Sequence, residues 1–149
     1  MDFEKCSEVS THSLIVVAEN KRKFTLRNSA KLPVRKVLVD GCLITDNTRL
    51  RCDYLFEIGK KCHCAVYLEL KGSDIGQAFD QLVATIGQIV ERHKTANLVC
   101  HIVASRVPRA GPSVQNLKLR MARKYKALLL VGTNEVTIDL QASVYGNHC

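Results

Sequence analysis

The chain has 149 residues, of which 46% are hydrophobic and 24% are charged, so it has the composition of an ordinary globular protein and not of a disordered chain. Its length is close to the commonest size of one domain and is sufficient to bury a core. The formal net charge of +8 favours a polyanionic partner, although a basic protein without such a partner has the same composition.

The sequence also bears on compartment and membrane association. It has no run of eighteen apolar residues and no basic amphipathic helix with an apolar face, so we expect no membrane span and no membrane-surface binding. The first residues lack the apolar region of a signal peptide, which predicts a cytoplasmic protein. The seven cysteines are then expected to be reduced thiols.

The N-terminal part of the chain is predicted to be rich in strands. Residues 12–19 and 22–27 are apolar or alternating and flank a turn at residues 20–22, which indicates a hairpin. Residues 34–44 form a further apolar strand, interrupted at Asp40 and Gly41 by a bulge or tight turn.

The central region predicts a hairpin followed by a crossover. Residues 52–58 and 65–71 are aliphatic and aromatic, with Gly59 and two lysines between them. A helix with one apolar stripe follows, capped by Ser73 or Asp74 and ending near residue 93. Residues 97–105 then form a buried strand, and a strand–helix–strand order implies parallel pairing.

The C-terminal part contains a helix over residues 113–125 and strands over residues 127–131 and 136–140. Together these elements predict one α/β domain with a mixed central sheet flanked by helices. Its segments would be the N-terminal strands (12–44), the core (50–105) and the C-terminal helix and strands (113–140).

The hairpin over residues 52–71 holds the residues with the clearest chemical potential. Side chains alternate along a strand, so Tyr67, Glu69 and Lys71 share one face, with Glu69 and Lys71 about 7 Å apart. A hairpin centred on Lys61 places Asp53 opposite Glu69, at a Cβ separation of roughly 4.5–5.5 Å.

Two carboxylates in that position repel each other unless a cation lies between them. Their hard oxygen ligands suit Mg²⁺ or Mn²⁺, and Lys71 would stand beside an attacking water or a phosphate. The alternative is structural: Asp53 is then a turn residue, and Glu69 and Lys71 form a solvated ion pair. A register slip of one residue would turn Asp53 to the other face.

Asp53, Glu69-x-Lys71 and a following helix with Gln81 resemble the core of the PD-(D/E)xK nuclease superfamily, which includes restriction endonucleases and archaeal Holliday junction resolvases. The string from residue 37 to residue 82 also resembles a group of small bacterial proteins with this core. The resemblance covers roughly residues 35–105. It implies a restriction endonuclease-like fold.

The resemblance also implies roles for individual residues. Asp53 and Glu69, with the carbonyl of Leu70, would bind Mg²⁺ or Mn²⁺, while Lys71 assists catalysis and Gln81 lies near the metal. Cys52 occupies the position of the proline that names the superfamily. Many members supply a further Glu from an N-terminal helix, for which this sequence offers only two candidates, Glu19 and Asp40.

Basic residues near the C-terminal helix suggest contacts with phosphates, although a solvated helix face is the alternative. They are Arg106, Arg109, Lys118, Arg120, Arg123 and Lys124. With four Tyr, four Phe and no Trp, a stacking platform for single strands is poorly supported, so we expect double-stranded or branched DNA. A homodimer through an edge strand is a further expectation.

Zinc is a weaker alternative. Cys52, Cys62, His63 and Cys64 are potential ligands, but three consecutive residues of an extended segment point in opposite directions. Structural zinc ligands are usually spaced by two to four residues. We therefore expect buried or incidental thiols here.

The sequence thus predicts a Mg²⁺-dependent endonuclease. One alternative is a catalytically inactive protein of nuclease fold that binds nucleic acid. Another is an interaction subunit in a defence or mobile-element system, whose basic face contacts an acidic protein.

Overall fold

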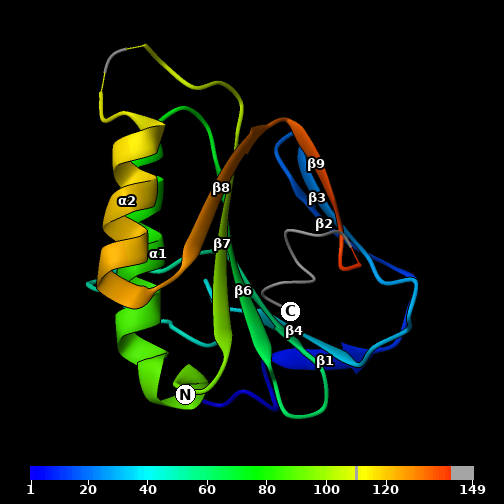
Figure 1. Cartoon of the computed structure of the whole chain (residues 1–149). Coiled ribbons are helices and arrows are strands. Elements are labelled where there is room, and N and C mark those ends of the chain that lie inside the picture. Colours follow the sequence, from blue (N-terminus) through cyan, green and yellow to red (C-terminus); the bar gives the residue numbers. More distant parts are fainter. Residues whose placement is uncertain (110, 142–149) are drawn as a thin grey trace.

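The computed structural model describes residues 1–109 and 111–141. Two helices cover one face of a six-stranded sheet, and a three-stranded sheet covers the other face (Figure 1). The larger sheet has the order β1 (Ser7–Ser10), β4 (Val34–Leu38), β5 (Tyr54–Ile58), β6 (Cys64–Lys71), β7 (Asn97–Ala104) and β8 (Leu128–Thr133). The smaller sheet has the order β2 (Leu14–Glu19), β3 (Arg22–Arg27) and β9 (Glu135–Asp139). The helices are α1 (Ile75–Ile89), its 3-10 extension η1 (Val90–His93) and α2 (Val114–Tyr125).

The larger sheet is mixed, as the sequence predicted. Strands β6, β7 and β8 pair in parallel, with α1 and α2 as their crossover connections. Strands β1, β4, β5 and β6 pair antiparallel. The chain is therefore a single α/β domain, and its predicted crossover unit is confirmed.

The second sheet was not expected. The predicted hairpin over residues 12–27 forms as β2 and β3, but β3 pairs in parallel with β9 and lies across the larger sheet. The rings of Phe24 and Phe56 lie 5.9 Å apart between the two sheets. Strand β1 was also missed, since it has one apolar residue, Val9, and lies at an edge.

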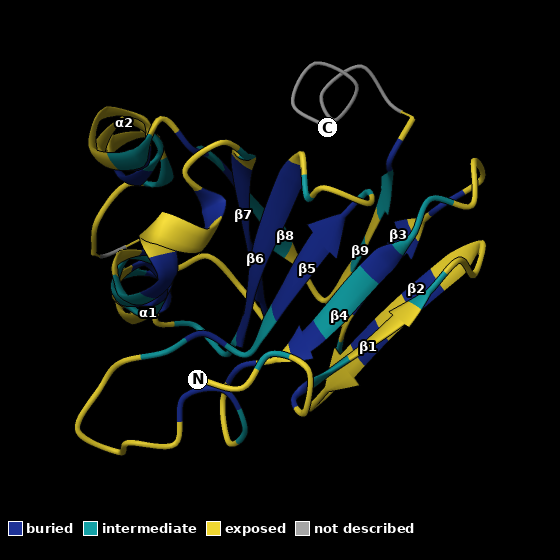
Figure 2. Ribbon diagram, turned by 90° about the horizontal axis from the view of Figure 1, so that it is seen from below, coloured by how far each residue is buried: buried dark blue, intermediate teal, exposed yellow. Residues whose placement is uncertain are grey.

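Strand β6 lies at the centre of both hydrophobic cores, and its residues are buried along almost its whole length (Figure 2). Val66, Leu68 and Leu70 pack toward the smaller sheet. Ala65 and Tyr67 pack on the helix side. This confirms the predicted alternation, and it directs Glu69 and Lys71 toward the helices.

Helix α1 is fastened to the beginning of β5 by a buried threonine. Asp74 caps the helix by accepting the Gln77 N–H at 2.9 Å. One turn further on from Gln81, the Thr85 hydroxyl donates to the Gln81 carbonyl at 2.7 Å and accepts the Cys52 N–H at 2.8 Å. This contact holds the segment that precedes β5 against the helix.

Cys6 and Cys42 form a disulfide, and Cys64 is also disulfide-bonded, so the prediction of reduced thiols is wrong for these three residues. β1 lies beside β4, and the Cys6 carbonyl accepts the Leu38 N–H at 2.9 Å. This pairing brings the start of β1 next to the turn after β4, a proximity that the sequence separation of 36 concealed. Stable disulfides are typical of oxidising compartments, so the cytoplasmic location stays a prediction.

None of the helices in the described part of the chain is long and apolar enough to cross a membrane.

We expect Thr85→Val to lower the free energy of unfolding by about 1–3 kcal/mol, because the isosteric side chain leaves the buried Cys52 N–H without an acceptor. Chemical denaturation would measure the change. Thr137→Val, at an exposed position of β9, is the matched control and should change stability little. Equal effects of the two substitutions would contradict this role for Thr85.

Candidate functional site

The hairpin has the predicted register. Tyr54 pairs with Leu68 and Ile58 pairs with Cys64, as in a hairpin centred on Lys61. One step further, the Asp53 N–H donates to the Leu68 carbonyl at 3.1 Å. Asp53 therefore lies opposite Glu69 and on the same face of the sheet.

The two carboxyl groups interact directly and share a poorly solvated environment. Glu69 is 2% exposed, and burial together with the neighbouring charge of Asp53 raises its pKa to about 9. Burial also raises the pKa of Asp53, against the opposing effect of the Leu70 N–H, which donates to Asp53 Oδ2 at 2.8 Å. At neutral pH, in the absence of a cation, the pair therefore retains a proton on Glu69.

One oxygen of this pair is an unsatisfied acceptor. Glu69 Oε1 is buried and has no hydrogen-bond partner among the described residues. A buried carboxyl oxygen without a hydrogen-bond partner is costly unless a ligand supplies the missing contact. The donor set of two carboxylates fits a hard divalent cation, which would replace the proton.

Lys71 and Gln81 are held together at the same end of β6. Lys71 Nζ donates to Gln81 Oε1 at 3.2 Å, and Gln81 Nε2 donates to the Arg51 carbonyl at 3.0 Å. The Lys71 charge is close enough to Glu69 to lower its pKa, though by less than burial and Asp53 raise it. The fold thus brings the four predicted side chains, Asp53, Glu69, Lys71 and Gln81, into one cluster.

The remaining predicted ligands have less defined positions. Leu70 contacts Asp53 through its N–H, and the role of its carbonyl stays a prediction. Glu19 and Asp40 both lie near enough for their charges to raise the pKa of Asp53, while Asp40 is engaged by Arg51 Nε at 2.8 Å. Within the described residues no helix precedes β5, so neither acid comes from an N-terminal helix.

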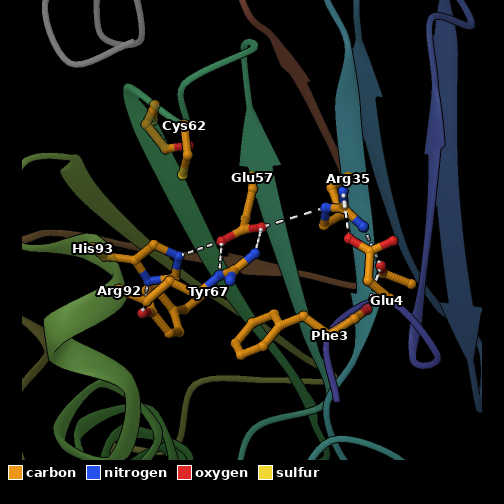
Figure 3. Close-up of polar contacts among 10 residues, drawn as sticks. Phe3, Glu4, Arg35, Glu57, Cys62, Tyr67, Arg92 and His93 are labelled. Carbon is orange, nitrogen blue, oxygen red and sulfur yellow. Dashed lines mark hydrogen bonds and ion pairs between the residues drawn. The ribbon is translucent and has the colours of Figure 1, made fainter. Parts of the chain in front are cut away.

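A second cluster with ligand-type atoms lies at the other end of β5. Atoms of Glu57, Cys62 and His93 lie within 4.8 Å of one another, so they could in principle hold a metal (Figure 3). Both Glu57 oxygens, however, accept hydrogen bonds from Arg92, at 2.7 and 2.8 Å. The two ring nitrogens of His93 contact Glu57 and the Tyr67 hydroxyl, each at 2.6 Å.

The hydrogen-bonding groups of Glu57 and His93 in this cluster already have protein partners, in contrast to Glu69 Oε1. It also differs from the four ligands weighed for zinc, because Cys52 is buried at the opposite end of β5 and bonds the Tyr54 carbonyl. Sequence patterns do not bring this cluster together, since Glu57 lies in β5 while Arg92 and His93 come from the 3-10 turn after α1.

The predicted phosphate-binding residues fall into two groups. Arg106 and Arg109 are exposed in the loop that leaves β7, at the end of the sheet where β6 also ends. On α2, Arg120 lies over the Phe79 ring at 4.7 Å, whereas Arg123 and Lys124 occupy the last turn. Lys118 is partly buried in the same helix. Since α2 runs back along the sheet, its last turn is distant from the end of β6 (Figure 1).

No known protein-family model matches the chain, and comparisons with curated proteins and with solved structures found no significant similarity. The resemblance to the PD-(D/E)xK superfamily therefore rests on the motif residues.

We expect Glu69→Gln to stabilise the metal-free protein at pH 8 by an amount on the order of 1–3 kcal/mol. The folded state raises the pKa of Glu69 from 4.5 to about 9, so its stabilising contribution is full below pH 4.5 and is lost as the pH rises toward 9. The glutamine needs no proton and removes this loss.

Thermal or chemical unfolding between pH 5 and 9, with a chelator present, would measure the difference. Glu91→Gln is the control, because Glu91 is an exposed residue whose carboxylate lies 3.8 Å from Lys94 Nζ. A wild-type protein whose stability declines no more steeply than that of Glu69→Gln over this range would contradict the burial argument.

Proposed function

We propose that the protein is a divalent-cation-dependent phosphodiesterase that acts on nucleic acid, with Asp53 and Glu69 as the cation ligands. The single observation that carries the proposal is the opposed carboxyl pair of the partly buried Asp53 and the buried Glu69, one of whose oxygens has no hydrogen-bond partner among the described residues. A purely structural pair would be expected to hydrogen-bond both oxygens or to contain an arginine. The +8 charge of the chain supports a polyanionic substrate.

Four residues of the chain would each have a role in phosphodiester hydrolysis. Asp53 and Glu69 would hold Mg²⁺ or Mn²⁺, which when bound lowers the pKa of water and neutralises charge on a phosphate. Lys71 would stabilise the charge that develops on the phosphate or orient the attacking water. Gln81 would keep the lysine in place, because its amide group links Lys71 to the Arg51 carbonyl.

Double-stranded or branched DNA is the substrate that we favour, held by its backbone. The loop that carries Arg106 and Arg109 begins beside the end of β6, where Lys71 lies. The two arginines are therefore suited to contact a flanking phosphate. The basic residues of α2 would extend this contact. A homodimer, formed through an exposed edge such as β2 with Leu14 and Val16, would allow both strands to be cut.

We expect Mn²⁺ binding to release about one proton and its affinity to rise by about tenfold per pH unit between pH 6 and 8, because the ion must replace the Glu69 proton. Calorimetry in two buffers with different ionisation enthalpies measures the proton release.

Asp53→Asn and Glu69→Gln should abolish this binding. The control is Cys62→Ser, which alters the other group of ligand-type atoms and should leave binding unchanged. If Cys62→Ser abolished binding and the two other variants did not, the ion would belong to the Glu57, Cys62 and His93 cluster.

We expect Lys71→Ala to retain Mn²⁺ binding but to cleave DNA at least about 100-fold more slowly, because it removes charge stabilisation and no metal ligand. Plasmid, linear duplex and branched DNA with Mg²⁺ or Mn²⁺ are the substrates. Lys21→Ala, at an exposed turn, is the control.

The alternative is a catalytically inactive protein of the same fold that binds nucleic acid or an acidic protein. The observation that favours it is the lack, in the described part of the chain, of a helix before β5 to supply a further acid. It would be supported by salt-dependent DNA binding with no metal-dependent cleavage of any of these substrates.

A further inference from the structure

A cavity of about 410 Å³ opens at the end of β5 that is remote from Asp53. Its charged lining consists of Arg35, Lys60, Lys61 and Arg92, with Glu57 as the acidic member. Four residues separate Glu57 from Asp53, so the cavity is roughly 13 Å along the strand from the proposed metal site. It is a separate site, and the proposed phosphodiesterase chemistry does not use it.

Glu57 organises two guanidinium groups on this wall (Figure 3). It is 5% exposed, and its two oxygens accept hydrogen bonds from Nε and Nη2 of Arg92. Arg35 Nε lies 3.6 Å from Oε1, the oxygen that also accepts from Arg92 Nη2. Although burial alone would raise its pKa, hydrogen bonds from Arg92 and His93 hold the pKa of Glu57 at about 2. The carboxylate is therefore ionised and saturated, and its role is to fix the two arginines in position.

Arg92 is also fixed from a second direction. Its guanidinium lies over the Phe3 ring at 3.7 Å, so the orientation of the group is set by a stacking contact as well as by Glu57. Glu57 occupies only the Nε–Nη2 edge, and Nη1 makes no hydrogen bond with the residues that the structure describes. A preformed arginine with a free donor edge is well suited to bind an oxyanion.

The opposite wall is a short turn with a defined shape. Gly59 has φ +88°, and a Cβ at this position would lie 2.3 Å from His63 Nδ1, so only glycine fits. The turn is anchored because the Gly59 N–H donates to the Pro33 carbonyl at 2.9 Å. It carries the exposed Lys60 and Lys61 at the rim of the cavity.

The charge balance of the cavity favours an anion and opposes a metal. Four positive groups face one carboxylate in the lining. Among the described residues the only other acid paired with them is Glu4, whose side chain is 86% exposed and lies 3.4 Å from Arg35. A cation at Glu57 would have to displace Arg92. Burial also raises the pKa of Cys62 to about 11, so its thiol stays protonated and is a poor ligand.

We propose that this cavity binds a phosphate group, held by Arg35 and Arg92 and closed over by Lys60 and Lys61. Free phosphate and the terminal phosphate of a nucleic acid present the same oxygen atoms to this site. The Nη1 edge of Arg92 offers those oxygens a donor of fixed orientation, whereas Arg35, whose Nη1 donates to Ser7 Oγ at 2.7 Å, and the two lysines add positive charge.

The first test is calorimetric titration of the full chain with inorganic phosphate at pH 7. We expect saturable binding that is weakened about tenfold or more by the double variant Lys60→Gln/Lys61→Gln, whose exposed positions leave the fold intact. The control is Lys21→Gln/Lys23→Gln, which makes the same change in net charge at exposed positions of the β2–β3 hairpin. Equal weakening by the two double variants, or no saturable heat, would overturn the proposal.

Arg35→Gln, which removes a guanidinium but leaves Arg92 on Glu57, should also weaken phosphate binding. Glu69→Gln should leave phosphate binding unchanged. A loss of phosphate binding can therefore be distinguished from a failure of the proposed metal site. Two oligonucleotides, identical except for a 5′-phosphate or a 5′-hydroxyl, then separate the sources. Tighter binding of the 5′-phosphorylated oligonucleotide, lost in the Lys60→Gln/Lys61→Gln variant, indicates that the site binds a nucleic-acid end. Equal binding of both oligonucleotides, neither of which competes with inorganic phosphate, indicates that the site binds the free ion.

Discussion

The opposition of Asp53 and Glu69 across the β5–β6 hairpin is the constraint on which the interpretation of this protein depends. Both carboxyl groups face the helix side of the strand pair, where Glu69 is buried and Asp53 is partly buried. They cannot both be ionised at that separation without a cation, so the pair retains a proton or binds a metal. The register of the hairpin fixes the two residues opposite each other on one face, so a slip that separated them would break the pairing of β5 with β6.

The acidic residues near the two ends of strand β5 are stabilised in different ways. At its far end, Glu57 receives hydrogen bonds from Arg92 and His93, and its pKa falls to about 2. Just before its beginning, Asp53 meets Glu69, whose oxygen lacks a partner among the described residues and whose pKa rises to about 9. At one end the protein supplies arginine and histidine donors to the acid, whereas at the other end Lys71 is nearby but bonds Gln81 and leaves the Glu69 oxygen without a partner. The unsatisfied end is therefore the one at which an external cation gains most.

Much of this arrangement follows from local sequence patterns. Alternation along residues 65–71 and the glycine and lysines of the turn were sufficient to place Asp53 opposite Glu69, because hairpin register is a local property. The placement of Gln81 near the metal site rested on the resemblance more than on helix geometry. The Cys6–Cys42 disulfide, the second sheet and the Glu57 cluster were not predicted. Each depends on segments that are distant in sequence and that periodicity alone does not bring together.

Helix α1 couples the two ends of the sheet. Its residues Gln81 and Thr85 contact the segment before β5, and its extension η1 supplies Arg92 and His93 to the other end of the same strand. Tyr67 completes the connection, since its hydroxyl meets His93 while its neighbour on the same face of β6 is Glu69. A shift of this helix along the sheet would misalign Lys71 and Arg92 together. The packing of α1 on β6, and not either polar cluster alone, therefore sets the geometry of both candidate sites.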